Sequence, residues 1–264
     1  MIRNLPPREP AVRQRRKEAR PSELADAALE LFVEKGFAAT RLEEIAGRAG
    51  VSKGTLYLYF DSKEALFESV IREGLLPLIE AGETITQFMP GGGWEGDIEA
   101  LANHAGLPPG AEYLRIDRSD DRPVEADKLG GIVLANHYER LLRVLLFGWW
   151  DRIGASRLGG IPKLMNAEAA NFPEVARFFR EQVISRGRKL VASVLEAGMA
   201  NGAFRPLPIE DSVTLFLAPA IHLAMTWQSP AFCGSEVTDP HAFLSNYLEI
   251  FVRGIRADAR GQPQ

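Results

Sequence analysis

The sequence contains very little cysteine and histidine, the side chains that many metal and nucleophilic sites use. Its 264 residues include one cysteine, Cys233, and four histidines. A single cysteine excludes an internal disulfide and a cysteine-rich zinc site, and it fits a reducing compartment. The histidines are scattered, and none belongs to a His-Glu-x-x-His pattern. We therefore expect no metal and no cofactor.

A long apolar run is also missing. The most apolar stretch, residues 141–150, is interrupted by Arg143 and is shorter than the roughly 20 residues that a membrane-spanning helix needs. No apolar run follows the arginines near the start of the chain, as a secretory signal would require. These features predict a cytoplasmic protein.

The patterns that mark several common enzyme classes do not occur. The run Ser52-Lys53-Gly54-Thr55 lacks the Gly-Lys-Ser/Thr order of a phosphate-binding loop, and no strand precedes a Gly-x-Gly-x-x-Gly. Gly-x-Ser-x-Gly is absent as well. We expect that the protein is not an enzyme. The alternative is a catalytic site without a recognisable pattern in the helical part of the chain.

Charge is distributed unevenly along the chain. The formal net charge is −4, yet residues 1–20 carry seven basic against two acidic side chains, so the remaining residues carry −9. A basic segment on an acidic chain fits a protein that contacts phosphates at one end only, and a solvated tail is the alternative. We expect residues 1–20 to form a flexible basic arm that enters the minor groove or contacts phosphates.

Helical periodicity runs through nearly the whole chain, and no segment alternates as a strand would. A first helix is expected from Ser22, an N-cap residue after Pro21, to Gly36, which suits a helix C-cap. A second helix opens with residues 40–43, Thr-Arg-Leu-Glu, which fit a capping box with Thr40 as the cap.

A third and a fourth helix follow at short spacing. Gly50 can take the positive φ of a tight turn, and Ser52 then caps a short helix that ends near Leu58. Asp61 or Ser62 caps the next helix, whose buried side is expected to consist of Leu66, Phe67, Val70 and Ile71. Short helices with a glycine turn between the second and third form a helix-turn-helix.

A helix-turn-helix presents the N-terminal residues of its third helix to the major groove of DNA. In residues 52–58, Leu56 has the position that faces inward, whereas Lys53 and Thr55 point outward toward base edges. Gly54 lets the protein and DNA backbones approach closely. Hydroxyls and an ammonium that can contact phosphate surround this helix, on Tyr57, Tyr59 and Lys63.

Residues 24–66 resemble the DNA-binding domain of the TetR family of regulators. The resemblance is strongest over residues 49–57, Ala-Gly-Val-Ser-Lys-Gly-Thr-Leu-Tyr, and over residues 62–66, Ser-Lys-Glu-Ala-Leu. The chain departs from the family at Arg41, where Ser or Thr is common, and at Leu58, where an aromatic is common. The resemblance implies that DNA is contacted by Thr40, Arg41, Ser52, Lys53, Gly54, Thr55, Tyr57, Tyr59 and Lys63.

The resemblance also implies an all-α fold, with an N-terminal helix-turn-helix domain and a C-terminal helical domain that dimerises and binds a small molecule. Some of the implied DNA contacts have a plainer interpretation. Thr40 is equally well explained as a helix cap. Tyr57 is alternatively half buried in the core, and Lys53 and Lys63 are alternatively ordinary solvated lysines.

Beyond residue 70 the resemblance is limited to residues 172–205, which are similar to the ligand-binding domain of one TetR branch. Pro-Gly clusters and a charged stretch predict a long irregular insertion over residues 86–131. Helices are expected over residues 132–153, 161–170, 173–200 and 208–228, and from 239 to about 257. We divide the chain into an arm (1–20), a helix-turn-helix domain (21–70), a helical domain (71–257) and a tail (258–264).

The helix expected over residues 208–228 is apolar on two opposite faces, so both faces need cover. We predict that this helix and the last one form a four-helix bundle with their copies in a homodimer. The alternative is that one subunit buries both helices. The predicted interface includes Val213, Phe216, Ala220, Phe243, Tyr247 and Phe251. A dimer places two reading helices about 34 Å apart, matching successive major grooves of a near-palindromic operator.

Large, mostly apolar side chains in the helical domain either form core or line a cavity for an apolar or aromatic molecule. They are Phe147, Trp149, Trp150, Met165, Phe172, Phe178, His222, Met225 and Trp227. Adjacent helix residues diverge by about 100°, so Trp149 and Trp150 are expected to face different surroundings. A ligand that changes the separation of the reading helices would release DNA, which predicts a repressor. A ligand-independent regulator or an activator of the same fold is the alternative.

Overall fold

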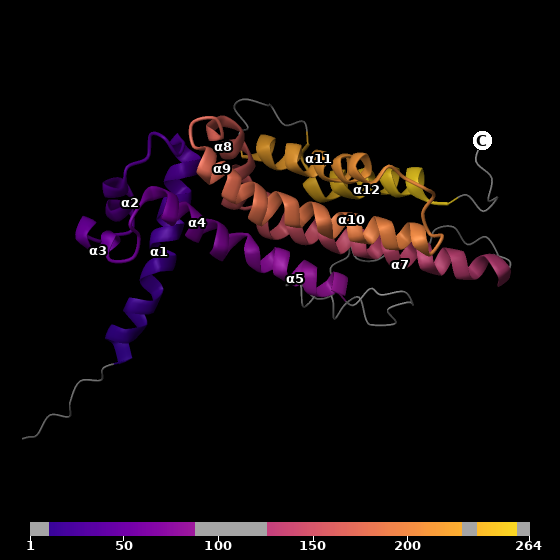
Figure 1. Ribbon diagram of the computed structural model, residues 1–264, viewed down its shortest axis with the longest axis horizontal. Helices are drawn as coiled ribbons and strands as arrows, with labels where there is room; N and C mark the ends of the chain where they lie inside the picture. The colour runs from indigo at the N-terminus through magenta and orange to yellow at the C-terminus, as the bar shows by residue number, and fades with distance from the viewer. Residues whose placement is uncertain (1–10, 88–125, 229–236, 258–264) are drawn as a thin grey trace, which may run out of the picture. The chain divides into compact units, whose positions relative to one another are not determined.

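The computed structural model describes residues 11–87, 126–228 and 237–257, and Figure 1 shows that regular structure there is helical. These ranges contain no strand, apart from an isolated antiparallel bridge between Phe204 and Arg256. The all-α prediction is confirmed. The chain divides into two compact units, unit 1 (Met1–Glu73) and unit 2 (Gly74–Gln264). No helix within the described ranges is both long and apolar enough to cross a membrane.

Unit 1 contains α1 (Ala11–Lys35), α2 (Leu42–Arg48), α3 (Lys53–Tyr57) and α4 (Lys63–Gly74), which ends at the unit boundary. Gly36 and Gly50 follow α1 and α2 with φ values of 90° and 67°, as the sequence predicts. The Ser52 hydroxyl caps α3 by accepting the N–H of Thr55 at 3.1 Å. The Ser62 hydroxyl caps α4 by accepting the N–H of Ala65 at 3.0 Å.

The first helix begins at Ala11 rather than at Ser22, so residues 11–20 are helical and Pro21 lies inside α1. The backbone angle of proline is compatible with a helix, and its missing N–H and ring clash cost about 3 kcal/mol. The ten residues before it are mostly Ala, Arg, Gln, Lys and Glu, which favour helix strongly. The helix start predicted at Ser22 is therefore corrected to Ala11.

The cap of α2 also differs from the prediction. Arg41, not Thr40, precedes the first helical residue, and its N–H donates to the Glu44 carboxylate at 3.0 Å. The Thr40 side chain is turned inward, with its hydroxyl donating to the carbonyl oxygens of Gly36 at 2.7 Å and Leu31 at 3.2 Å. The acidic residue that completes the capping box is thus Glu44, one residue later than the predicted Glu43.

Three phenylalanines form the centre of unit 1. Phe32, Phe37 and Phe67 are at most 1% exposed, and their ring centroids are 5.0 to 6.1 Å apart. Phe37 and Phe67 meet edge to face, a favourable arrangement for aromatic rings. The buried side of α4 consists of the four residues that its periodicity predicts. This core fixes the helices on which α3 depends.

Unit 2 is built from longer helices that run side by side in Figure 1. α10 packs against α5, α7 and α11, and α12 packs against α7 and α11. The main helices are α5 (Leu76–Gln87), α7 (Ala126–Trp149), α8 (Ile161–Glu168), α9 (Pro173–Phe179), α10 (Ser185–Ala200), α11 (Ile209–Trp227) and α12 (Pro240–Ile255).

Short turns of other helix types join some of these helices. A π-helical turn, η2 (Trp150–Gly154), follows α7, and a 3-10 turn, η3 (Arg157–Gly160), precedes α8. A second π-helical turn, η4 (Arg180–Ile184), joins α9 to α10, so the helix expected over residues 173–200 is interrupted in its hydrogen-bond pattern. Pro173 begins α9, as predicted for a first-turn proline.

The predicted irregular insertion at 86–131 is too long at its C-terminal end, because α7 begins at Ala126. Gly130 and Gly131, at the predicted end of the insertion, lie inside α7. A glycine inside a helix costs only about 1 kcal/mol, which tertiary packing readily offsets. Residues 88–125, most of the predicted insertion, lie outside the described residues.

Candidate functional site

The exposed side of α3 in unit 1 consists of Ser52, Lys53, Gly54, Tyr57 and Leu58, which we name the recognition surface. Leu56 on the opposite side of α3 is 0% exposed and packs with α2, whose Ile45 and Ala46 are buried. One buried leucine thus orients the helix. Its other side chains remain at the surface, in the positions that a reading helix requires.

Lys53 on the recognition surface forms an ion pair with Glu43 of α2. The hydrogen bond from Lys53 lowers the pKa of the Glu43 carboxyl and raises that of the lysine. The ammonium also lies 5.8 Å from the centroid of the Tyr57 ring. Because the pair is solvent-exposed, it stabilises unit 1 little and can be exchanged for a contact with DNA.

The Ser52 and Thr55 hydroxyls belong to the cap of α3. Their oxygens are 2.8 Å apart, and the Ser52 oxygen also accepts the backbone N–H of Thr55. Ser52 is exposed, whereas Thr55 is half-buried. Their first function in the structure is therefore to fix the start of the helix, and a contact with DNA remains a prediction.

Gly54 has an open Cβ position. A Cβ built on it would have the Ser52 hydroxyl oxygen as its nearest neighbour, at 3.9 Å, which is an ordinary contact. Neither packing within unit 1 nor a positive φ requires glycine at this position. A requirement for close approach by another molecule would explain the residue.

Thr40 and Lys63, both predicted to contact DNA, are engaged inside unit 1. Thr40 is 2% exposed, so its side chain cannot reach DNA. The Lys63 ammonium donates to the carbonyl oxygens of Phe37 at 2.6 Å, Ala38 at 3.2 Å and Thr40 at 3.1 Å. Since an ammonium has three donors, these bonds use all of them. Both predictions are corrected: these side chains hold the loop between α1 and α2.

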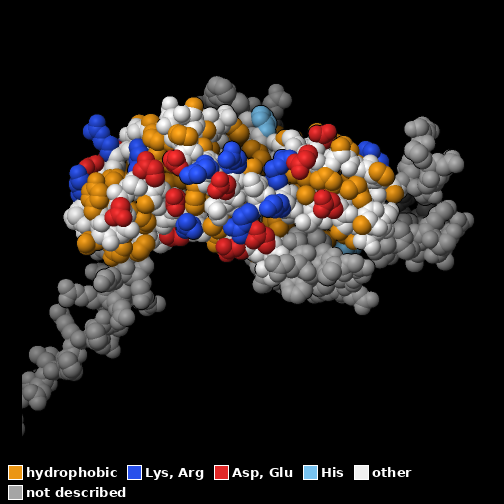
Figure 2. Space-filling view, viewed as in Figure 1, with side chains coloured by type: hydrophobic (Ala, Val, Ile, Leu, Met, Phe, Trp, Pro, Cys, Tyr) orange, Lys and Arg blue, Asp and Glu red, His pale blue; other side chains and the backbone are white. Residues whose placement is uncertain are grey.

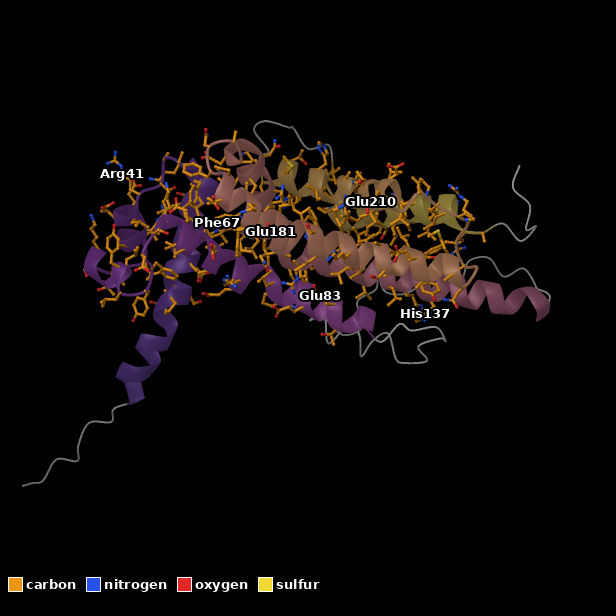
Figure 3. The ribbon with its side chains drawn as sticks, viewed as in Figure 1. Arg41, Phe67, Glu83, His137, Glu181 and Glu210 are labelled. Atoms are coloured by element: carbon orange, nitrogen blue, oxygen red, sulfur yellow. The ribbon has the colours of Figure 1, made fainter. Side chains whose placement is uncertain are left out.

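The remaining predicted DNA contacts lie at or near the surface of unit 1. Arg41 is exposed and points away from the helices in Figure 3. Tyr57 is 44% exposed, and Tyr59 is half-buried. Leu58, which the sequence marked only as a departure from the family, is 80% exposed at the end of α3. An apolar side chain there can contact a thymine methyl group or a sugar.

Unit 2 has a cavity of about 840 Å³ between α5, α7, α8, α9, α10 and α11, partly open to solvent. Its walls are mainly aliphatic and aromatic, with Ile79 from α5, Leu145 from α7, Val183 from η4 and Leu217 from α11 among them. This volume lies within the roughly 300–1,000 Å³ range of sites for small molecules. Unit 2 therefore has room for a ligand of drug size or larger.

A close contact between α5 and α10 forms one wall of the cavity. Gly82 lets the helices approach, since a Cβ on it would lie 2.7 Å from Leu190 Cδ1. Beside it, Arg186 donates from Nε and Nη2 to the two carboxylate oxygens of Glu83 at 2.7 and 2.6 Å. This hydrogen bonding lowers the pKa of Glu83, which is labelled in Figure 3. The bidentate pair ties α5 to α10.

Of the residues predicted to line a ligand site, Trp149 and Met165 line this cavity. Trp150 is 1% exposed and packs edge to face with Trp227, with 6.3 Å between the ring centroids. Trp149 and Trp150 therefore face different surroundings, as the helical angle predicts. Phe147 is 0% exposed in the core of unit 2. The other predicted residues lie outside the cavity lining: Phe172, Phe178, His222, Met225 and Trp227.

The predicted residues of α11 lie outside the cavity lining because a different face of this helix meets the cavity. Phe216, Leu217, Ala220 and Ile221 of this helix line the cavity, whereas His222 is exposed. The sequence analysis missed most of the lining, including all of α5 and the segment from α9 to α10. The available signal was helical spacing, because the lining residues of this segment recur every three or four positions: Arg180, Val183, Ile184, Gly187, Leu190 and Val191.

Half of the predicted dimer interface is buried inside one chain. Val213, Phe216 and Ala220 are 1–2% exposed in unit 2, so they cannot also face a second copy. Phe251 packs against Phe216 at 5.4 Å. The Tyr247 hydroxyl donates to the carbonyl oxygen of Phe216 at 2.7 Å, and burial raises its pKa. The prediction is wrong for the three buried residues, because apolar residues on both faces of α11 did not distinguish core from surface.

The opposite face of α11 and α12 is exposed and partly apolar. Leu215 is 65% exposed, Ile250 is 74% exposed and Phe243, part of the predicted interface, is 37% exposed. Figure 2 shows hydrophobic side chains reaching the surface over these helices, between acidic and basic ones. We name Leu215, Phe243 and Ile250 the outer apolar face.

Comparisons with known proteins match both units. A family model described as "Bacterial regulatory proteins, tetR family" matches residues 24–70. Over 240 residues the chain is 28% identical to the HTH-type transcriptional repressor KstR2 of Rhodococcus jostii, which covers 90% of this chain and 92% of the relative. Over 61 residues it is 49% identical to the HTH-type transcriptional regulator RutR of Escherichia coli, covering 23% of this chain and 29% of the relative.

Among solved structures, the fatty acid degradation regulator FadR from Bacillus halodurans has the same fold. It superposes with a TM-score of 0.54 at 16% sequence identity and covers 94% of this chain and 97% of its own. The family match contains the recognition surface, and the likeness to KstR2 extends over both units.

Proposed function

Because this chain belongs to the TetR family of bacterial regulatory proteins, we propose that it is a cytoplasmic homodimeric repressor that leaves its operator when a small molecule occupies the cavity of unit 2. The observation that carries the proposal is the recognition surface: a capped, leucine-anchored helix whose outward side chains have no packing function. Lys53, Gly54 and Tyr57 read the major groove, and Arg41 contacts phosphate.

Two copies are needed because one short reading helix buries too little surface to bind tightly. The outer apolar face supports a dimer through α11 and α12, since large apolar side chains exposed together mark interaction surfaces. We expect size-exclusion chromatography with light scattering to give a dimer at micromolar concentration. Leu215→Glu with Ile250→Glu is expected to yield monomers.

Leu58→Glu is the matched control for that experiment, because Leu58 is also a largely exposed leucine, in unit 1. It should leave the dimer intact. If the unmodified protein is a monomer at micromolar concentration, or if Leu58→Glu dissociates it as readily as the double variant does, the outer apolar face is not the interface.

Control by a ligand follows from the path of the chain. α5 contributes Leu78, Ile79 and Gly82 to the cavity wall, and Leu75 alone separates α5 from α4. A molecule that displaces α5 therefore moves the segment that connects directly to α4 of unit 1. A ligand that binds the displaced form better shifts the population away from the DNA-binding form.

The test is fluorescence anisotropy on a duplex taken from upstream of the gene, against a scrambled duplex, across a salt series. Specific binding at least about a hundredfold tighter than to the scrambled duplex supports the reader function. Lys53→Ala should weaken specific binding by about tenfold, the value of one good base contact. Equal, weak binding to both duplexes, and no site obtained by selection from random duplexes, would contradict it.

Lys35→Ala is the matched control, because Lys35 pairs with Glu44 as Lys53 pairs with Glu43, in both cases from a lysine to α2. Only the Lys53 pair lies on the recognition surface, so Lys35→Ala should leave specific binding unchanged. Specific binding that no compound weakens would favour the ligand-independent regulator. Transcription that rises on binding would favour an activator.

A further inference from the structure

The charge of the cavity lining in unit 2 is entirely of one sign. The described residues that line it include three arginines, Arg177, Arg180 and Arg188, and no aspartate or glutamate. The other lining side chains are apolar, apart from Asn166 and two glycines. Guanidinium groups at its edge, with no carboxylate among the lining residues, favour an anion there.

Arg177 and Arg180 stand three residues apart where α9 passes into η4, so they lie on the same side of the helix. Arg177 pairs with Glu174 at 2.5 Å, but both side chains are largely exposed, at 60% and 77%. Such a surface pair is weak and exchangeable. Arg180 has no ion pair within the described ranges, and the neighbouring Glu181, labelled in Figure 3, does not line the cavity.

Arg188 differs from these two arginines. Its guanidinium donates to the Glu210 carboxylate at 2.6 Å and to the Thr214 hydroxyl at 3.1 Å, so it is already neutralised and held against α11. Of the three lining arginines, only Arg180 and the weakly paired Arg177 therefore leave positive charge available at this wall of the cavity.

We propose that the cavity binds an anionic amphiphile, with its apolar body against the aliphatic walls and its carboxylate or phosphate group at Arg177 and Arg180. Guanidinium groups bind both anions through charge-assisted hydrogen bonds. This inference rests on the proposed function only in taking the cavity as the effector site. It adds the chemical class of the effector, which the apolar lining alone leaves open.

The experiment is isothermal titration calorimetry of the full chain with dodecyl probes below their micelle concentrations. Laurate, dodecyl phosphate, dodecanol and dodecyltrimethylammonium share one chain and differ in their head groups. We expect laurate or dodecyl phosphate to bind at least tenfold more tightly than dodecanol, and the cation to bind most weakly. The tighter of the two anions identifies the carboxylate or phosphate source.

Arg180→Gln should remove most of the preference for the anions while leaving dodecanol affinity unchanged. Lys189→Gln is the matched control, because Lys189 is an exposed cation on α10 that does not line the cavity. Ala176→Trp fills a lining position and should weaken all four probes if they occupy the cavity. Circular dichroism verifies that each variant is folded.

Equal affinities for laurate, dodecyl phosphate and dodecanol would overturn the inference and leave ligand control by a neutral molecule intact. The inference would also be overturned if Arg180→Gln left the affinity for the anions unchanged, or if Lys189→Gln lowered it by the same factor. An anion affinity that is unchanged in Ala176→Trp would overturn it as well. Arg180-dependent anion binding with no effect on DNA affinity would support the binding site and contradict release by this ligand. The two proposals therefore fail separately.

Discussion

The two units of the chain differ in how they use their interiors. In unit 1, Phe32, Phe37 and Phe67 fill the centre with ring centroids 5.0 to 6.1 Å apart. In unit 2, a more extensive core built around Phe147 and Trp150 lies beside a cavity of about 840 Å³. Unit 1 places its candidate functional groups on its surface, whereas unit 2 places them around an internal space.

The size of the cavity shows that it is not a tolerated packing defect. Close-packed interiors contain few voids larger than a water molecule. A cavity of about 840 Å³ that is partly open to solvent is far larger and falls in the range of ligand sites. A filled core suits a unit that must hold one helix rigidly, and a hollow one suits a unit that must respond.

The sharpest test of this contrast compares one aromatic truncation in each unit. Phe67→Ala should cost about 3–5 kcal/mol of unfolding free energy, because Phe67 is 1% exposed and contacts two other rings. Trp149→Ala should cost less, about 1–2 kcal/mol, because one side of that ring already faces the cavity. Urea denaturation followed by circular dichroism measures both.

Phe147→Ala is the control for Trp149→Ala within unit 2, since Phe147 is 0% exposed on the same helix. It should behave as Phe67→Ala does. If Trp149→Ala and Phe147→Ala cost the same, the cavity wall is packed as tightly as the core and the contrast between the units fails.

A second contrast concerns ion pairs. Those of unit 1 are at the surface, such as Arg48 with Glu30 at 2.8 Å. In unit 2, Glu139 is 5% exposed and accepts from Arg256 at 2.5 Å and from Arg143 at 3.4 Å. Glu139→Ala leaves the largely buried Arg143 guanidinium without this carboxylate, so we expect a loss of about 3 kcal/mol in unfolding free energy.

The matched comparison is Arg48→Ala in unit 1, which breaks exposed pairs and should lower the unfolding free energy far less than Glu139→Ala does. Both variants are measured by urea denaturation at neutral pH. A loss in Glu139→Ala no greater than that in Arg48→Ala would mean that the buried carboxylate has no more effect on stability than a surface one.

The sequence predicted unit 1 more closely than unit 2, and the reason is the range of the interactions. The turns at Gly36 and Gly50 and the caps at Ser52 and Ser62 depend on residues three or four positions away. Lys63 was assigned to DNA wrongly, because its carbonyl partners lie 23 to 26 residues earlier in the chain. Helical spacing does not predict such distant contacts.

In unit 2 the sequence predicted the helices but not the direction of their faces. α11 is apolar on both sides, so Val213 and Leu215 had equal claims to the core until the neighbouring helices were known. The first is 1% exposed and the second 65%. The cavity arises from side chains of several helices and has no local sequence pattern. The sequence therefore predicted Trp149 and Met165 as lining residues, but not Arg177 of α9 and Arg180 of η4.

Glycine provides a prediction confined to unit 1. Gly54→Ala should weaken binding to the operator by about tenfold, because a methyl group would separate α3 from the DNA, while the fold gains up to about 1 kcal/mol from better helix propensity. Gly47→Ala in α2 is the control, since it also has an open Cβ position. It should gain the same stability with no loss of affinity, measured by anisotropy and urea denaturation. Equal affinities in the two variants would show that close approach at Gly54 is not required.

The smallest expected effect is a pH dependence in the unfolding free energy of unit 2. Burial lowers the pKa of His137 in α7, and Arg140 lowers it further. The unfolded chain, with an ordinary histidine pKa of about 6.5, therefore binds the proton before the folded chain does. The unfolding free energy of unit 2 should decline as the pH falls below about 6.5 and should be insensitive to this group above that value. Glu83, whose pKa is lowered by the hydrogen bonds from Arg186, affects stability only in a more acidic range, below the ordinary glutamate pKa of 4.5. Urea denaturation of His137→Gln between about pH 5.5 and 7.5 should show a flatter pH dependence, with exposed His222→Gln as the control. A slope unchanged in His137→Gln would assign the acid sensitivity to other groups.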